Sequence, residues 1–205
     1  KPQQPQSPQW DSANGKLIFD YSMSLSGFES ALRNVYYVNT SDNPNTNDRT
    51  VSIQIFDGDS LSNTLTRDIE IIAVNDAPVL ANMEATDTTF TENGDGVKIT
   101  QSVTISDIDD TNIDSAAVWI SGNYQSDEDS LFAEMPDKSK GGGNTPEWDS
   151  ANGKLIFDYS MLLENFQTAL RNVYYVNTSD NPNTNDGTVS IRIFDGDSLS
   201  NTLTR

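Results

Sequence analysis

The chain contains no cysteine and no histidine, and these two absences exclude several kinds of chemistry. Disulfide scaffolds, thiol catalysis, zinc ligation by thiolate or imidazole, and triads with a histidine base all need one of these residues. Long apolar runs are also missing, since no stretch approaches the roughly 18 apolar residues that indicate a transmembrane helix. We therefore expect neither a thiol- or histidine-dependent enzyme nor membrane insertion.

Positively charged residues are scarce. The 205 residues include 12 Lys and Arg against 31 Asp and Glu, which gives a formal net charge of −19. A field of this sign repels phosphate backbones and anionic lipid headgroups, so no nucleic acid is expected as a partner. The same field attracts divalent cations, although acidity of this kind also serves solubility alone.

A long internal repeat organises the chain. Residues 8–67 (the first copy) recur as residues 146–205 (the second copy), with Trp10 aligned to Trp148 and a period of 138 residues. The copies differ at eight aligned positions, namely Gln9/Glu147, Ser24/Leu162, Ser26/Glu164, Gly27/Asn165, Glu29/Gln167, Ser30/Thr168, Arg49/Gly187 and Gln54/Arg192. A period of this length is that of a whole domain rather than of a solenoid unit.

The register of the repeat sets the expected domain organisation. Residues 1–80 are expected to hold the C-terminal half of one repeat, and residues 81–205 the following repeat without its last strand. The chain then has one N-terminal half of a repeat, at about 81–145, and two C-terminal halves with which it could complete a sandwich. We therefore expect the unpaired half to be partly disordered, swapped or associated, and any export signal to lie outside this chain.

Alternation of apolar and polar residues predicts strands. Val51, Ile53 and Ile55 alternate with polar residues, and the pattern returns at residues 189–193 of the second copy. Further strands are predicted at 16–21, 65–73, 97–106, 116–121 and 154–159. An Asn-Gly turn signal precedes the first of these, at Asn14.

One short helix is predicted in each copy. Apolar residues fall at helical spacing, namely Phe28, Ala31, Leu32 and Val35 in the first copy and Phe166, Ala169, Leu170 and Val173 in the second. Many short strands with little helix predict an all-β fold, an antiparallel Greek-key β-sandwich with one short helix per repeat. The glycine-rich stretch at 138–146 is expected to be a flexible excursion.

Carboxylates gather where the predicted strands end. Asp107, Asp109 and Asp110 follow the 97–106 strand closely, and Asp57 and Asp195 each begin an Asp-Gly-Asp motif after an apolar strand. Calcium takes about six to eight oxygen ligands, and loops that converge at one end of a sandwich can supply them. Each motif alone is also ordinary turn chemistry, so the prediction rests on their combination.

This combination resembles the cadherin-like tandem repeats of large bacterial cell-surface adhesins, in the superfamily that also includes chondroitin-sulfate-proteoglycan-type repeats. The motifs that carry the resemblance are Glu92-Asn93, Asp107-x-Asp109, Asp195-Gly196 and the linker Asn75-Asp76-Ala77-Pro78. The resemblance covers residues 76–205 and implies the cadherin- or immunoglobulin-like sandwich. The unit is longer than a typical cadherin repeat, and the acidic Asp-Arg-Glu motif of that family has no visible counterpart.

The resemblance also implies calcium at the junction near Asp76. The implied ligands are Asn75, Asp76, Asp107, Asp109 and Asp195 at this junction, Glu92 at the next junction downstream and Asp57 at the one upstream. The implied function is a non-catalytic, calcium-binding module in the rod or stalk of an extracellular adhesin, at the cell surface or secreted. Ca²⁺ would stiffen the junctions between neighbouring repeats of the same chain, and a cell-surface protein or polysaccharide would be the outside partner.

Two other functions remain open on the sequence. The alternative is a carbohydrate-binding module of a secreted polysaccharide-degrading protein, with Trp119 as the residue to test, although the tryptophans are placed like core residues. A glycosidase-like enzyme would need two carboxylates about 5–10 Å apart in a cleft. The acids here fall in turn motifs, so we expect no enzyme.

Overall fold

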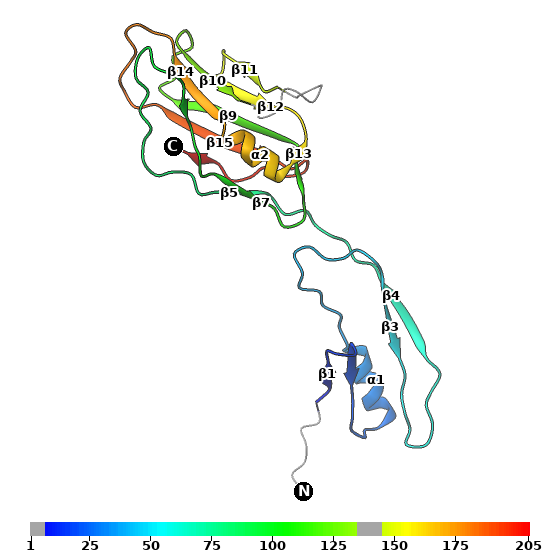
Figure 1. Cartoon of the computed structure of the whole chain (residues 1–205). Helices are drawn as coiled ribbons and strands as arrows, with labels where there is room; N and C mark the ends of the chain where they lie inside the picture. The colour runs from blue at the N-terminus through cyan, green and yellow to red at the C-terminus, as the bar shows by residue number, and fades with distance from the viewer. Residues whose placement is uncertain (1–6, 135–144) are drawn as a thin grey trace. The chain divides into compact units, whose positions relative to one another are not determined.

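A computed structural model describes residues 7–134 and 145–205, and the chain divides into two compact units, Lys1–Thr40 and Ser41–Arg205. Most regular structure in the described residues is strand, with two short helices (Figure 1), so the all-β class is confirmed. None of these helices has the length and apolar character that crossing a membrane requires. The expected domain boundary near residue 80 stays a prediction, and residues 138–144 of the glycine-rich stretch lie outside the described residues.

The first unit contains the beginning of the first copy. Its elements are β1 (Gln9–Asp11), β2 (Lys16–Ile18) and α1 (Leu25–Arg33). β1 and β2 form an antiparallel hairpin in which Trp10 lies opposite Leu17. The helix begins at Ser24, whose Oγ accepts the N–H of Gly27 at 3.2 Å. No residue of α1 is buried.

The second unit contains the remaining elements. They are β3 (Arg49–Ile53), β4 (Leu65–Ile69), β5 (Val79–Ala81), β6 (Val97–Lys98), β7 (Thr104–Ser106), β8 (Asn112–Ile113), β9 (Ser115–Gly122), β10 (Asp129–Ala133), β11 (Glu147–Asp149), β12 (Lys154–Phe157), β13 (Met161–Leu162), α2 (Leu163–Leu170), β14 (Val173–Asn177), β15 (Thr188–Phe194) and β16 (Leu203–Thr204). The largest sheet has the order β11-β12-β9-β15-β16, and a second has the order β10-β14-β6. The pairs β3-β4, β5-β7 and β13-β8 form two-stranded sheets.

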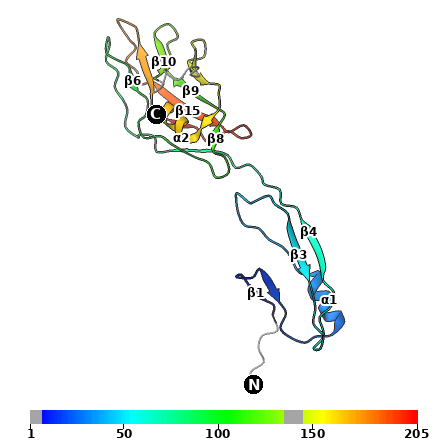
Figure 2. The ribbon, with the colours of Figure 1, turned by 45° about the vertical axis from the view of Figure 1, so that its right-hand side comes forward.

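Apolar side chains from both larger sheets, from β5-β7 and from α2 form one core. Val118 of β9, Phe157 of β12 and Ile191 of β15 are fully buried, as the alternation in each strand requires. The helix α2 contacts β7, β8 and β13 and adds Phe166 and Leu170 to the core. Figure 2 shows α2 close to β8. The helix is therefore part of the packed interior and not a surface appendage.

The prediction of a single strand at 97–106 was wrong. β6 and β7 belong to different sheets, and a turn separates them. The hydroxyl of the fully buried Thr100 accepts the N–H groups of Ser102 and Val103, at 3.3 and 3.2 Å. The apolar pattern does not reveal this break, because Ile99 before the turn and Val103 after it are both buried.

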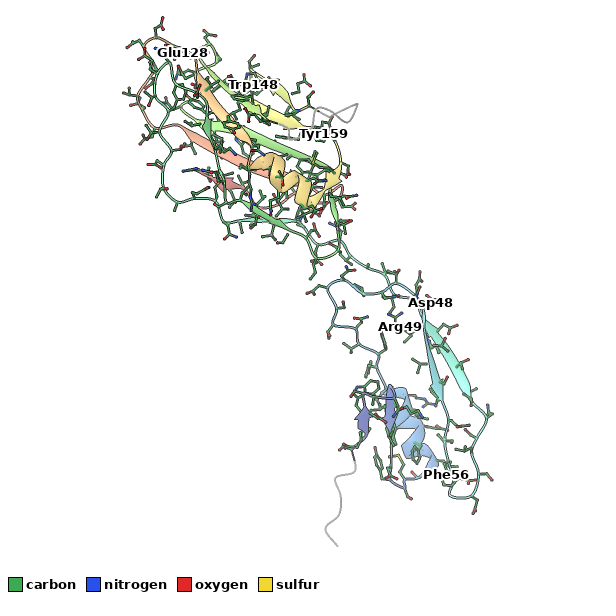
Figure 3. The ribbon with its side chains drawn as sticks, viewed as in Figure 1. Asp48, Arg49, Phe56, Glu128, Trp148 and Tyr159 are labelled. Carbon is green, nitrogen blue, oxygen red and sulfur yellow. The ribbon has the colours of Figure 1, made fainter. Side chains whose placement is uncertain are left out.

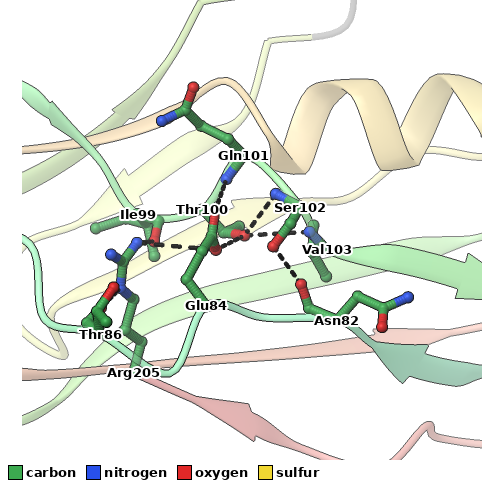
Figure 4. Close-up of polar contacts among 9 residues, drawn as sticks. All are labelled: Asn82, Glu84, Thr86, Ile99, Thr100, Gln101, Ser102, Val103 and Arg205. Atoms are coloured by element: carbon green, nitrogen blue, oxygen red, sulfur yellow. Dashed lines mark hydrogen bonds and ion pairs between the residues drawn. The ribbon is translucent and has the colours of Figure 1, made fainter.

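Polar contacts hold this turn against the end of the second copy (Figure 4). Glu84 accepts a hydrogen bond from the Thr100 hydroxyl at 2.6 Å and one from the N–H of Gln101 at 2.7 Å. The guanidinium of Arg205 lies 3.8 Å from Glu84 and donates to the carbonyl oxygen of Ile99 at 2.6 Å. Although burial acts to raise the pKa of Glu84, the hydrogen bonds from Thr100 and Gln101 outweigh it and lower the pKa to about 2.

Several strands were not predicted, β10 and β14 among them. β14 lies between β10 and β6, with Tyr175 opposite Leu131 on one side and Val97 on the other. Its sequence alternates weakly, because Tyr174 and Tyr175 stand side by side. Both neighbours of β14 come from residues before the second copy, so the strand depends on pairing that is distant in sequence.

Candidate metal centre

Three chain segments meet where β7 and β15 end. Asp107 directly follows β7, and Asp195 directly follows β15. The segment leading into β5 reaches both: the side-chain amide of Asn75 donates to Asp195 Oδ2 at 3.1 Å, and the N–H of Asp76 donates to Asp109 Oδ2 at 3.0 Å. The structure thus brings together the five residues that the resemblance assigned to this junction.

Short turns orient the acidic side chains. Asp107 Oδ1 accepts the N–H groups of Asp109 and Asp110, at 3.2 and 3.0 Å. Asp195 Oδ1 likewise accepts the N–H groups two and three residues later, at 2.7 and 2.6 Å. These are Asx-type turns, which Asp favours because its short side chain reaches the following backbone. In each turn the second carboxylate oxygen is left for contacts outside the turn.

The carboxylates converge. Asp107, Asp110 and Asp195 each place a carboxylate oxygen within 4.8 Å of the others. Asp107 Oδ2 and Asp109 Oδ1 are buried, and neither has a hydrogen-bond partner within the described residues. Burying a charged oxygen without a partner costs free energy, and a bound cation between these oxygens would offset that cost.

The electrostatics reflect this crowding of like charges. Burial raises the pKa of Asp107, and it also raises the pKa of Asp110, to which the charges of Asp107 and Asp109 add. Burial acts in the same direction on Asp195, but N–H donors, Ser198 first among them, outweigh it and lower the pKa of Asp195. The cluster is therefore a region where negative charge is concentrated and only partly compensated.

The donor set decides which ion suits the cluster. All donors are carboxylate oxygens, whereas zinc sites are built mostly from thiolate and imidazole. Magnesium demands nearly octahedral geometry and keeps much of its water, while calcium accepts irregular sets of oxygens from several loops. The residues present fit calcium, with Asp107, Asp109, Asp110 and Asp195 as the oxygen donors. Asn75 turns the N–H of its side-chain amide toward Asp195 and holds that carboxylate in place.

Two predicted ligands lie elsewhere. Glu92 is exposed, and its Oε1 accepts the side-chain amide of Asn93 at 3.4 Å. Asp57 is exposed in the loop after β3, where its Oδ1 accepts the N–H groups of Asp59 and Ser60, at 2.9 and 2.8 Å. Neither belongs to the cluster near Asp76, and their assignment to neighbouring junctions stays a prediction.

One member of the cluster was missed. Asp110 was noted in the acidic run after the 97–106 segment but was not assigned as a ligand. The turn at Asp107 reverses the chain so that the residue three positions later faces back toward Asp195. The Asx-turn propensity of Asp107 was the signal that could have identified it.

Comparison of the chain with protein-family models, with curated protein sequences and with solved structures found no match in any of the three. The interpretation of the site therefore rests on its own geometry and on the motifs that form it.

Proposed function

We propose that this chain is a non-catalytic, calcium-binding repeat module of an extracellular adhesin, in which Ca²⁺ stiffens the junction before β5. The observation that supports it is the convergence of Asp107, Asp110 and Asp195 within 4.8 Å, beside two buried carboxylate oxygens that lack partners. In this proposal the two larger sheets are the layers of a Greek-key sandwich. The immediate partners are neighbouring repeats, and a cell-surface protein or polysaccharide is the outside partner.

The ion would act on the segment that carries Asn75 and Asp76. That segment is tied to the acidic turns by the two hydrogen bonds to Asp195 and Asp109, and the carboxylates around it repel one another. A divalent cation converts the repulsion into attraction between segments that are distant in sequence. The junction then loses conformational freedom, which is what a load-bearing rod or stalk requires.

Calcium titration tests the proposal. Extracellular calcium modules bind with dissociation constants of about 10⁻⁴–10⁻³ M, so about 5 mM Ca²⁺ should stabilise the fold by about 1–2.3 kcal/mol. Calorimetric titration should give an affinity in this range, and the melting temperature should rise by several degrees between EDTA and calcium. Identical unfolding curves and no binding heat would contradict the proposal.

The repeat supplies a matched control for this experiment. Asp195→Asn keeps the acceptor for the turn N–H groups but removes a charge from the cluster, so calcium affinity should fall about tenfold or more. Asp57→Asn makes the same change at the equivalent position of the first copy, outside the cluster, and should leave the affinity unchanged. Equal effects of the two variants would show that the cluster is not the binding site.

A groove supports the second candidate, carbohydrate binding. It runs over the outer face of β9, β12 and β15 and includes Trp119, Lys154 and Arg192 in its lining. The ammonium of Lys154 lies 5.9 Å from the ring centroid of Trp119, which places a cation on the surface that a sugar would stack against. Affinity electrophoresis on polysaccharides tests this function: retardation that Trp119→Ala abolishes would favour it over the calcium module.

A further inference from the structure

The first copy retains the core-facing residues of the second. Of the eight positions at which the copies differ, none is buried in the second copy, and Gln167 is the one that is half-buried. Every buried residue of residues 146–205 therefore has an identical counterpart in residues 8–67. The first copy is chemically equipped to pack as the second copy does.

None of these residues is buried in the first copy, where each is exposed or half-buried. The contrasting pairs are Leu155 at 2% and Leu17 at 38%, Val173 at 0% and Val35 at 38%, and Ile191 at 0% and Ile53 at 36%. Trp148 (labelled in Figure 3) packs edge-on against Tyr124, with ring centroids 6.2 Å apart. Its counterpart Trp10 is 64% exposed. Because identical residues form a core in the second copy, the exposed apolar residues of the first copy indicate a surface that packs against a partner.

The structure shows what covers these residues in the second copy. β9 pairs with both β12 and β15, so that Val118 lies opposite Leu155 and Ile191. In the first copy, the counterparts of β12 and β15 are β2 and β3. Among the described residues β2 pairs only with β1, and β3 only with β4. The element missing from the first copy is thus a strand with the sequence of β9.

Polar recognition of residues 79–134 is retained as well. In the second copy Asn201 bonds to Leu80, Arg205 to Thr86, Arg171 to Val103, Asn172 to Lys98 and Tyr175 to Asp129, at 2.5–3.0 Å. The counterparts in the first copy are the identical residues Asn63, Arg67, Arg33, Asn34 and Tyr37. Gln167 accepts the N–H of Ile105 at 3.0 Å, and its counterpart Glu29 also carries an acceptor oxygen.

We propose that the first copy is a second docking surface for residues 79–134 of this chain, which can leave the second copy and form the same core with residues 8–67. Residues 79–134 thus have two nearly identical partners. The arrangement that the structure shows is the more populated of the two in the unmodified chain. This inference does not depend on the proposed calcium function.

The chain connection permits the exchange. In the second copy Asn201 donates to and accepts from the backbone of Leu80, so the end of the copy lies beside β5. In the exchanged arrangement Asn63 would take this place and Arg67 that of Arg205, so residues 68–79 would connect Arg67 to Leu80. Such a rearrangement is a circular permutation, which folds tolerate when the joined ends lie close together.

Hydrogen exchange on full-chain variants tests the proposal. Ile191→Asp places a charge in the core of the second copy, so residues 79–134 should transfer to the first copy. The amides of β9 should stay protected, while protection moves from residues 189–193 to residues 51–55. Mass spectrometry separates these two segments because Gln54 stands where the second copy has Arg192.

The matched variants complete the test. Ile53→Asp alone should leave β9 protected, because the second copy still covers it, and Ile53→Asp with Ile191→Asp should remove that protection. Loss of β9 protection in Ile191→Asp as complete as in the double variant would overturn the proposal. Protection at residues 51–55 that is present only in a dimer, as measured by light scattering, would also overturn it. Repeating the series in EDTA and in calcium separates this result from that of the proposed function.

Discussion

The two copies differ at only eight positions, yet they form different structures. Their local pairings agree: Trp10 lies opposite Leu17 as Trp148 lies opposite Leu155, and β3-β4 has the same register as β15-β16. The long-range pairings differ, because residues 173–177 form a strand and their counterparts do not. Hairpins are therefore specified within each copy, whereas the sheets and the core depend on residues 79–134.

The physical reason lies in where the stabilising contacts come from. A two-stranded hairpin buries little apolar surface and is at best marginally stable alone. Burial of a large apolar side chain contributes about 1.5–3 kcal/mol, and in the second copy much of that burial is against β9, β5 and β7. The same sequence without these partners keeps its turns and leaves its apolar residues exposed or half-buried.

The largest expected effect is the difference in the free energy of unfolding between equivalent phenylalanine substitutions in the two copies. Phe157→Ala, made together with Ile53→Asp to block exchange, should lower the free energy of unfolding by about 3–5 kcal/mol, because Phe157 is fully buried. Phe19→Ala at the equivalent position should lower it by less than about 0.5 kcal/mol. Urea unfolding followed by circular dichroism measures both. Similar losses in the two variants would contradict the difference in packing between the copies.

A second comparison uses equivalent turn glycines. Gly153 has φ 62°, and a Cβ there would lie 3.0 Å from the ring of Tyr124. Gly15 has φ 61° with nothing within 4 Å. Gly153→Ala, also made together with Ile53→Asp to block exchange, should therefore destabilise the fold by about 2–4 kcal/mol through left-handed strain and a clash. Gly15→Ala introduces the left-handed strain without the clash, and it does so in the first copy, outside the packed core. The midpoint of the main unfolding transition should therefore stay unchanged.

The third prediction concerns pH and Glu84. Because its pKa is lowered to about 2 in the folded chain, Glu84 adds stability that is fully present above its unfolded pKa of 4.5. That contribution is lost as the pH falls from about 4.5 toward 2, and it amounts to about 2 kcal/mol after allowance for partial exposure. Glu84→Gln should lower the free energy of unfolding at pH 6 and flatten its decline in acid. Parallel pH profiles of the two proteins would contradict the role of Glu84.

Sequence reasoning identified the features that are determined by residues close together in the chain. Alternation located β3, β9, β12 and β15, and helical spacing located α1 and α2, within a few residues. It joined β6 and β7 into one strand because the turn at Thr100 preserves the apolar alternation. It missed β10 and β14 because their pairing, and not their pattern, makes them strands.

In the candidate site, too, the positions of the residues could be predicted, whereas a side-chain direction that depends on turn geometry could not. The resemblance placed Asn75, Asp76, Asp107, Asp109 and Asp195 together, as the structure has them. The side-chain direction of Asp110 depends on the turn geometry at Asp107, which residue spacing does not reveal. The identity of the ion remains a prediction that only binding measurements test.

Hydrogen exchange of the unmodified chain tests the central claim, that one sequence is packed in the second copy and unpacked in the first. Peptides covering residues 26–38 and 164–176 contain four of the differing positions, so mass spectrometry distinguishes them. The amides of residues 173–176 should exchange slowly, because β14 is paired on both sides, while those of residues 36–38 should exchange at nearly the unprotected rate. Equal protection of the two peptides in a monomer would contradict the account.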